Sequence, residues 1–165
     1  MLTVITSTIG RKSLFKLSES LSKQNVKIYH IILWDTKREN GGIEPYDKRL
    51  SELVNENYEV YHYIIKHPIF LKDKERIDNH MRLIGLTMAT SNFFTFIDDD
   101  CWVENKWCKT AIENIQSKNC DFCYCYRYIW DSDYNKIGLD NYESIGMKNN
   151  FGYHLIDMNT IIYNK

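Results

Sequence analysis

The sequence predicts a single-domain α/β fold in which a mostly parallel sheet is flanked by helices. Apolar, strand-like runs alternate with amphipathic, helix-like segments along most of the chain, which is the pattern of a layered parallel sheet. The 165 residues suffice for one core, and no repeat, low-complexity tract or change of composition divides them. We therefore predict one domain over residues 1–165, either compact or short at its C-terminal end.

The first half of the chain contains three strand patterns. Each is a short run of apolar and β-branched residues. Leu14, Leu17 and Leu21 recur with helical spacing after Ser13, which is a suitable N-cap. In order, we predict a strand over 2–6, a helix from 14, a strand over 27–34, a polar loop over 36–47, a short helix over 48–55 and a strand over 58–65.

The alternation continues in the second half. An irregular stretch begins at Pro68, and helical spacing of apolar residues then appears on both sides of a strongly apolar strand. In order, we predict a helix from Glu75 or Asp78 to Ala89, a strand over 94–97, a helix marked by Val103, Trp107, Ala111 and Ile115, a strand over 120–130, a turn over 131–136 and a last strand or docked segment over 153–163.

Three consecutive acids, Asp98, Asp99 and Asp100, follow the apolar run Phe94–Ile97. Adjacent carboxylates repel one another, so the run favours folding only if something positive lies between them. The carboxyl ends of strands are the ligand-binding edge of α/β sheets. Strand alternation puts Asp98 and Asp100 on one side, where they can hold Mn²⁺ or Mg²⁺ against a diphosphate. A solvated acidic loop is the alternative interpretation.

Two further residues point to the same edge. Asp35 ends the second strand pattern, where its carboxylate either accepts a hydrogen bond from a nucleobase or caps the turn. Arg82 lies in a helix pattern in which Gly85 and Ala89 form a narrow face that can approach the sheet closely. Arg82 then reaches the acids and the diphosphate, or else it is a solvated helix arginine.

Other motifs carry weaker signals. The run Ser7–Arg11 has a single glycine and lacks the Gly-Lys-Ser/Thr ending of a phosphate loop. The five histidines form no metal-binding pair and are expected to be structural. The five cysteines include one Cys-x-x-Cys pair without a second pair, so we expect core or half-buried thiols rather than zinc ligands.

The charge balance disfavours some classes of protein. Lys+Arg 21 and Asp+Glu 22 give a formal net charge of -1, which does not suit a protein that coats nucleic acid or an anionic membrane. No signal-peptide pattern opens the chain, and no apolar run reaches transmembrane length. We expect a cytoplasmic protein with no nucleic-acid partner and no transmembrane segment.

Three stretches taken together resemble family 2 glycosyltransferases. They are Thr6–Arg11 followed by Leu14, Leu21-Ser22 and Gln24, then Arg82-x-x-Gly85-x-x-x-Ala89, then Phe94–Asp100. The resemblance covers roughly residues 1–105. It implies a GT-A fold and a metal-dependent transfer, with Mn²⁺ or Mg²⁺, of a sugar from a nucleoside-diphosphate sugar. A UDP-sugar donor is favoured, the acceptor hydroxyl belongs to a glycan, a lipid-linked molecule or a protein, and the transfer is inverting.

The resemblance also implies roles for individual residues. Thr6, Thr8 and Asp35 would contact the nucleobase and ribose. Arg82 and Asp98 would contact the ribose and the diphosphate, and Asp99 would be an accessory residue near the donor. Asp100, together with Asp98, would bind the metal ion.

The chain departs from the family on the acceptor side. Inverting members carry a later Glu-Asp pair whose acid deprotonates the acceptor, and no such pair follows Asp100. Asp157 lies in a segment that resembles the acceptor side and is our candidate catalytic base; the other acids left open are Asp131, Asp133, Asp140 and Glu143. The alternatives are a non-catalytic nucleotide-sugar-binding remnant, a sugar-nucleotide nucleotidyltransferase and a metal-dependent nuclease.

Overall fold

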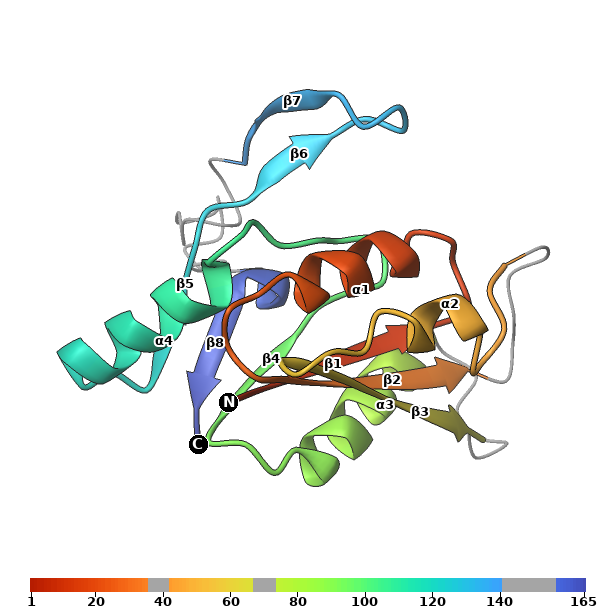
Figure 1. The fold of residues 1–165 in the computed structure, drawn as a ribbon, viewed down its shortest axis with the longest axis horizontal. Helices are drawn as coiled ribbons and strands as arrows, with labels where there is room; N and C mark the ends of the chain where they lie inside the picture. The colour runs from red at the N-terminus through yellow and green to blue at the C-terminus, as the bar shows by residue number, and fades with distance from the viewer. Residues whose placement is uncertain (36–41, 67–73, 141–156) are drawn as a thin grey trace.

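A six-stranded sheet with helices on both faces forms the body of the protein (Figure 1). The computed structural model describes residues 1–35, 42–66, 74–140 and 157–165, with only the backbone described for 74–76. Its strands are β1 (Leu2–Thr8), β2 (Ile28–Asp35), β3 (Tyr58–Ile65), β4 (Phe93–Phe96), β5 (Phe122–Tyr124), β6 (Tyr128–Trp130), β7 (Lys136–Leu139) and β8 (Ile161–Asn164). Its helices are α1 (Leu14–Ser22), α2 (Lys48–Ser51), α3 (Lys74–Met88), α4 (Trp107–Lys118) and the 3₁₀ turn η1 (Met158–Thr160).

The main sheet has the strand order β3-β2-β1-β4-β8-β5. β1 pairs in parallel with both β2 and β4, and β2 pairs in parallel with β3. β8 is antiparallel to β4 and β5. The predicted mostly parallel α/β sheet is therefore confirmed, and the strand order changes direction at β1, which puts a ligand-binding edge at the carboxyl ends of β1 and β4.

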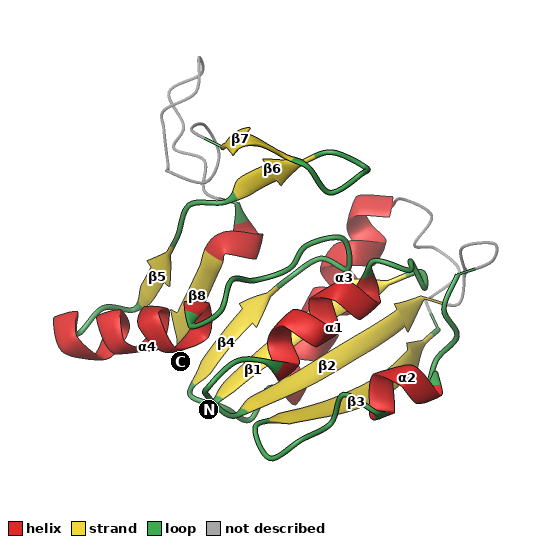
Figure 2. Cartoon of the chain, turned by 45° about the horizontal axis from the view of Figure 1, so that its top comes forward, coloured by secondary structure: helices red, strands yellow, loops and turns green. Residues whose placement is uncertain are grey.

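Two apolar clusters cover the two faces of the sheet. The cluster under α1, α2 and α4 includes Leu2, Val4 and Leu17, whereas the cluster under α3 includes Ile5 and Met81. Side chains of β1 therefore alternate between the faces, as a strand buried on both sides requires. Figure 2 shows α1 and α2 on one side of the sheet and α3 on the other.

The predicted close approach of α3 to the sheet is confirmed at Gly85. A Cβ atom at this position would lie 2.3 Å from Cγ2 of Ile5 and 3.1 Å from Cδ1 of Leu33. Only a residue without a side chain lets the helix sit this close to β1 and β2. The close contact fixes the part of α3 that carries Arg82, one turn before Gly85, against the carboxyl edge of the sheet.

The helix predicted over 48–55 ends at Ser51. Three further features, all in the second half of the chain, differ from the prediction. The single strand predicted over 120–130 is divided into β5 in the main sheet and β6, which pairs with β7 in a separate hairpin. The division falls at Arg127, whose side chain turns toward the carboxylates of Asp140 and Asp157. β7 was not predicted, and α4 begins at Trp107, so Val103 packs against the core from the preceding loop.

Some predicted segments lie outside the described residues. They are the first part of the polar loop (36–41), the irregular stretch from Pro68 (67–73) and the first part of the last predicted segment (153–156). Within the described part of the last segment, Tyr163 belongs to β8, so the final strand is confirmed there.

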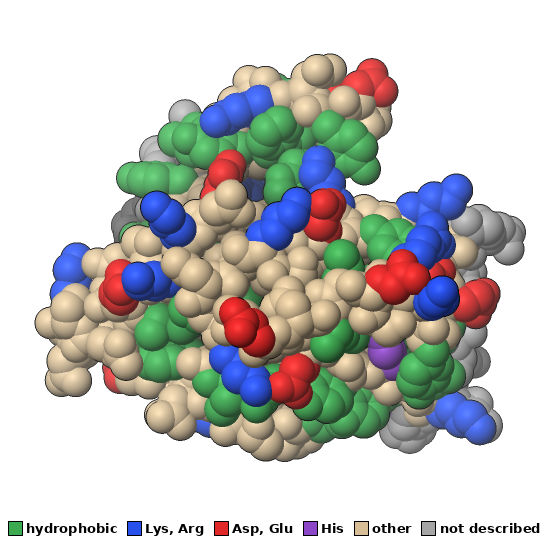
Figure 3. All heavy atoms as spheres, in the orientation of Figure 1, with side chains coloured by type: hydrophobic (Ala, Val, Ile, Leu, Met, Phe, Trp, Pro, Cys, Tyr) green, Lys and Arg blue, Asp and Glu red, His purple; other side chains and the backbone are tan. Residues whose placement is uncertain are grey.

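The β6–β7 hairpin extends beyond the main sheet (Figure 1). Figure 3 shows hydrophobic side chains gathered over it, while basic and acidic side chains are intermingled on the surface below. Tyr128, Ile129, Ile137 and Leu139 are among its exposed apolar residues. Within the part of the chain that the structure describes, no helix is both long and apolar enough to span a membrane.

Candidate functional site

A polar pocket of about 280 Å³ lies at the carboxyl edge of the sheet, and we call it the donor pocket. β1 contributes Ser7 and Thr8, β2 contributes Asp35, and α3 contributes Arg82. The three acids that follow β4 complete its wall. The pocket brings together Asp100 and five other residues predicted from the sequence: Thr8, Asp35, Arg82, Asp98 and Asp99.

The three acids lie in a turn rather than in a strand. β4 ends at Phe96, one more backbone hydrogen bond joins Ile97 N to Ile5 O (3.1 Å), and Cys101 N then donates to Asp98 O (3.0 Å). The expectation that strand alternation would separate Asp99 from its neighbours was therefore wrong. All three acids line the donor pocket, but each has different partners.

Asp98 is held from two directions. Arg82 Nη2 donates to Asp98 Oδ1 at 3.0 Å, and Asn159 Nδ2 donates to Asp98 Oδ2 at 3.1 Å. The backbone N of Asp98 also donates to Asn159 Oδ1 at 2.6 Å. One carboxylate thus bridges α3 and η1, and charge-assisted hydrogen bonds of this kind fix its orientation.

Asp99 is the buried member of the run, although it also lines the donor pocket. Its Oδ2 accepts a 2.5 Å hydrogen bond from Thr8 Oγ1, which itself accepts from Gly10 N, and its Oδ1 pairs with Arg11 Nη1 at 2.9 Å. Burial raises the pKa of Asp99, and the Thr8 hydrogen bond and the Arg11 charge oppose that rise. The loop from β1 to α1 is therefore fastened to the acidic turn.

Asp100 is the exposed member of the run. Its side chain is 58% exposed and lies 3.3 Å from Arg11 Nη1. The part of the chain that the structure describes has no group of three or more His, Cys, Asp or Glu side chains placed to hold a metal ion. Mg²⁺ and Mn²⁺ do not need such a cage, because one or two carboxylates plus phosphate oxygens and water complete their coordination. An exposed carboxylate beside an oriented one fits that donor set.

Thr6 is not brought to the pocket. It is fully buried, its hydroxyl donates to Ile97 O at 2.7 Å, and its oxygen lies 3.0 Å from His30 Nε2. His30 also bonds the hydroxyl of Tyr58 at 2.7 Å, so it is a structural histidine. Asp35 is buried and lines the donor pocket.

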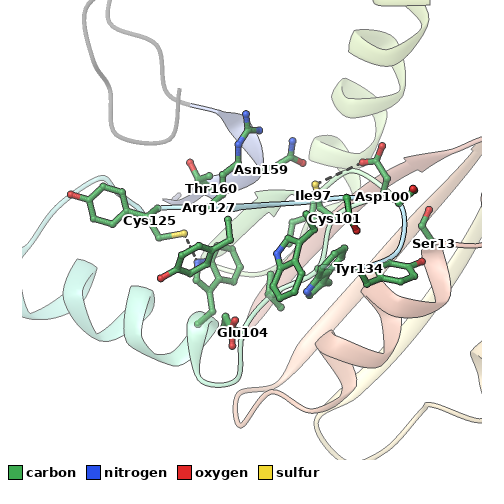
Figure 4. Close-up of a pocket in the computed structure, with 18 residues that line it drawn as sticks. Ser13, Ile97, Asp100, Cys101, Glu104, Cys125, Arg127, Tyr134, Asn159 and Thr160 are labelled. Carbon is green, nitrogen blue, oxygen red and sulfur yellow. Dashed lines mark hydrogen bonds between the residues drawn. The ribbon is translucent and has the colours of Figure 1, made fainter. Parts of the chain in front are cut away.

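A second, aromatic cleft of about 370 Å³ adjoins the donor pocket. Asp100 lines both, so it forms part of the boundary between them. Figure 4 shows Asp100 at one end of this cleft and Cys125 at the other. Six aromatic side chains contribute to the lining: Trp102, Trp107, Tyr126, Tyr128, Trp130 and Tyr134.

Asp157 belongs to an ion-pair cluster beside this cleft. Arg127 pairs with Asp157 Oδ2 and, through Nε at 2.6 Å, with Asp140 Oδ2. The other oxygen of Asp157 accepts from Asn159 N at 2.8 Å and from Asn159 Nδ2 at 2.9 Å, which caps η1. Both carboxylate oxygens of our candidate base are thus engaged, and Asp157 is not among the residues that line the cleft.

The other candidate bases are placed differently. Asp131 lines the cleft, but its oxygens accept from the backbone N of Asp133 and from Asn135, which holds the turn between β6 and β7. Asp140 is buried against Arg127. Glu143 lies outside the described residues.

The five cysteines are free thiols. Cys101 and Cys125 line the aromatic cleft. Burial, aided by Asp100 and Asp98, raises the pKa of Cys101 to about 12, and burial raises the pKa of Cys125. Both are therefore protonated at neutral pH, which makes them apolar wall rather than nucleophiles.

Sequence reasoning missed three residues of the site. Arg11 was considered only as the end of a phosphate loop, and no local pattern links Arg127 to Asp140. Asn159 had a signal, because Asp-x-Asn is typical of an Asx-capped turn. Nothing local, however, shows that this turn lies against Asp98, which is 61 residues away.

The region from α3 to β8 also matches a known protein family. Residues 80–163 match the domain described as glycosyl transferase family 2. The chain belongs to glycosyl transferase family 2. The matched region overlaps the resemblance noted above at residues 80–105 and extends it through α4 to Tyr163. No match was found among curated protein sequences.

Solved structures of TarS from S. aureus share the fold. TarS 1-349 in complex with UDP-GlcNAc aligns with a TM-score of 0.63 at 18% identity, covering 99% of this chain and 45% of that one. TarS 1-349 in complex with UDP gives 0.61 at 17% identity, covering 99% and 46%. A further TarS structure gives 0.55 at 18% identity, covering 73% and 20%. The fold is therefore GT-A-like, and the chain spans less than half the length of these TarS chains.

Proposed function

We propose that this domain binds a nucleoside-diphosphate sugar in the donor pocket and transfers the sugar to an acceptor hydroxyl in the aromatic cleft. One observation carries the proposal: Asp100 lines both cavities, so ligands in the two would meet at one exposed carboxylate. We favour UDP-sugars as donors. Asp35 lines the donor pocket and would accept the N3–H of uracil, and TarS was solved with UDP and with UDP-GlcNAc.

The residues fit a divalent cation. Asp100, with Asp98 beside it, would hold Mn²⁺ or Mg²⁺, and a cation bound there would neutralise charge on the departing diphosphate. Arg82 and Asn159 keep Asp98 oriented, while Arg11 and Thr8 keep Asp99 in place. This side of the site is therefore preorganised by the chain itself.

The transfer needs a general base that accepts the proton of the acceptor hydroxyl. The acceptor oxygen forms a bond to the anomeric carbon, the bond from that carbon to the diphosphate oxygen breaks, and the hydroxyl proton goes to a base. Asp157 is the base that we propose from the sequence, with inversion at the anomeric carbon. In that role its Oδ2 must exchange Arg127 for the acceptor hydroxyl.

The metal site is tested by nucleotide binding. We expect Mn²⁺ to lower the Kd of the native protein for UDP. In Asp100→Ala, which lacks the exposed metal ligand, the Kd in the presence of Mn²⁺ should be about tenfold higher or more. Isothermal titration with and without Mn²⁺ measures it, and Glu113→Ala, an exposed acid on α4, is the matched control. Equal affinity of the native protein for UDP with and without Mn²⁺ would contradict the proposed metal site.

The nucleotide preference is tested by thermal shift. UDP-, GDP-, CMP- and dTDP-sugars are compared with and without Mn²⁺, and a donor at about 100 times its Kd stabilises the fold by about 2.7 kcal/mol. This corresponds to a rise in Tm of several degrees. A larger shift with another nucleotide than with UDP would overturn the assignment of Asp35 to uracil.

A second candidate is a donor-binding unit without catalysis. It is favoured by one observation, that both oxygens of Asp157 are already bonded. Hydrolysis and transfer assays with Mn²⁺ distinguish the two functions. Turnover that Asp157→Asn abolishes supports the enzyme, whereas donor binding without turnover, unchanged in Asp157→Asn, supports the binding unit.

A further inference from the structure

We propose that the aromatic cleft binds a neutral saccharide as the acceptor, through stacking on Trp130 and its neighbours, and disfavours phosphate-bearing acceptors. This inference rests on the proposed function and narrows it from any hydroxyl acceptor to an uncharged sugar ring.

The lining of the cleft is suited to a pyranose ring. Its volume of about 370 Å³ lies in the range of small-molecule sites. Trp102 and Trp130 lie with ring centroids 5.5 Å apart, and Trp102 and Tyr134 lie 5.8 Å apart. A sugar ring presents one face of C–H groups and an edge of hydroxyls, and C–H groups pack against the electron-rich face of an aromatic ring. The carboxylates that line the cleft, those of Asp100, Glu104 and Asp131, can accept hydrogen bonds from the sugar hydroxyls.

The charge of the cleft argues against anionic ligands. Among the described residues that line it, Asp100, Glu104 and Asp131 are acidic and Arg127 is the basic one. The Arg127 guanidinium is already paired with Asp140 and Asp157. A cleft lined by one sign of charge raises the local concentration of the opposite sign and repels its own. A phosphate would therefore be repelled by the carboxylates of Glu104 and Asp131, whereas a neutral ring carries no charge to be repelled.

The aromatic wall is fixed from α1, so it is ready for a ligand. Lys16 Nζ lies 3.5 Å from the ring centroids of both Trp102 and Tyr134. The two centroids are 5.8 Å apart, so the Lys16 ammonium lies between the two rings. Cation–π contacts of this kind hold the turn between β6 and β7 against α1. The rings are thereby held in place before any ligand arrives, which lowers the entropy cost of binding.

The position of the cleft makes its occupant an acceptor rather than the donor's own sugar. Asp100 lies at one end of the cleft, and the aromatic rings extend away from it toward Cys125 (Figure 4). The donor pocket lies on the other side of Asp100, against α3. A separate saccharide can therefore occupy the cleft while a nucleotide fills the donor pocket.

Saccharide binding in the presence of saturating UDP and Mn²⁺ tests the proposal. The probes are methyl glucoside, cellobiose, lactose, maltose and chitobiose, with glucose 6-phosphate as the anionic counterpart, and saturation-transfer NMR detects weak binding. We expect at least one neutral sugar to bind and glucose 6-phosphate to bind more weakly. Absence of binding by every neutral sugar while UDP still binds would overturn this inference alone, because the donor site would then be intact. Loss of UDP binding would count against the proposed function instead.

Two further outcomes are decisive. Tighter binding of glucose 6-phosphate than of the neutral sugars would contradict the charge argument. A bound saccharide that a UDP-sugar displaces, but UDP does not, would show that the cleft holds the donor's sugar and would overturn the acceptor assignment.

The stacking itself is tested by substitution. Trp130→Ala should weaken saccharide binding about tenfold, the upper range for one aromatic contact, and leave UDP affinity unchanged. Tyr61→Ala, an exposed tyrosine on β3 that lines neither cavity, is the matched control. If Trp130→Ala does not fold, Trp130→Phe, with a smaller loss expected, and Tyr128→Ala replace it. Unchanged saccharide affinity in folded variants would overturn the proposal.

Discussion

At the scale of single residues, the buried polar groups of the sheet satisfy one another. Thr6 donates its hydroxyl proton to Ile97 O, so its oxygen accepts from His30 Nε2, and His30 Nδ1 accepts from the Tyr58 hydroxyl. His30 is fully buried, and this burial, with a smaller contribution from His62, lowers its pKa from 6.5 to about 3. His30 is therefore neutral in the folded protein at any pH near neutrality.

This buried histidine makes stability depend on pH. The unfolded chain takes up a proton at His30 near pH 6.5, but the folded chain does so only near pH 3. The free energy of unfolding therefore falls as the pH falls through this window, by about 2 kcal/mol at pH 5. Urea unfolding at pH 7.5 and pH 5 measures the change. His30→Gln, which keeps a polar group at the site, should lose less stability between the two pH values, and equal losses would show that His30 is not the cause.

Asp99 illustrates a different balance at the same scale. A buried carboxylate usually destabilises a fold, yet here Thr8 and Arg11 hold it and join two loops. The sequence identified the acid from its place after an apolar run. It did not identify Arg11, because a pair 88 residues apart leaves no local pattern.

At the scale of elements, the position of α3 sets the donor pocket. Gly85 allows the helix to touch Ile5 on β1, and Arg82, three residues before it, then reaches Asp98. This relation was predictable from sequence, since the small residues and the arginine share one helical face. It shows how a packing residue can determine ligand geometry without touching a ligand.

Replacing Gly85 tests this relation. By helix propensity alone, Gly85→Ala would stabilise α3 by about 1 kcal/mol. The added Cβ would overlap Ile5 Cγ2, however, and over-packing costs about 1–3 kcal/mol. We expect a net loss of stability and weaker UDP binding as Arg82 moves from Asp98. Thr87→Ala, on the exposed face of α3, is the control, and increased stability with normal UDP affinity in Gly85→Ala would refute the argument.

The elements that sequence reasoning missed lie in the second half of the chain. Residues 120–130 alternate like one strand, and β5 and β6 do both form within them. The chain leaves the main sheet between the two strands because Arg127 turns toward Asp140 and Asp157. Alternation predicts strands well, but it cannot show which sheet a strand joins when a long-range ion pair decides it.

At the scale of the whole molecule, the two halves of the chain meet at the acidic turn. The first half supplies β1, β2 and the loop with Arg11, and these were largely predictable because their patterns are local. The last segment supplies η1 and β8, which place Asn159 against Asp98. Composition and periodicity predicted the mostly parallel sheet and the donor edge. The aromatic cleft and the Asn159 contact could not be predicted, since they depend on how β8 inserts between β4 and β5.

The contact between Asp98 and Asn159 should therefore couple stability to donor binding. Asn159 donates to the Asp98 carboxylate and accepts from its backbone N, so removing either side chain leaves the other incompletely bonded. In a double-mutant cycle of Asp98→Ala and Asn159→Ala, we expect a coupling energy of about 1–3 kcal/mol in urea unfolding. Asn159→Ala alone should also weaken UDP binding, because Asp98 loses part of its orientation. Asn114→Ala is the control, because the Asn114 amide donates to Thr110 O within α4. The free energies of unfolding lost in Asn114→Ala and in Asp98→Ala should add to within about 0.5 kcal/mol. If the losses of stability in Asp98→Ala and Asn159→Ala are additive, η1 and β8 only cover the sheet. If the two losses are coupled, η1 is part of the donor site.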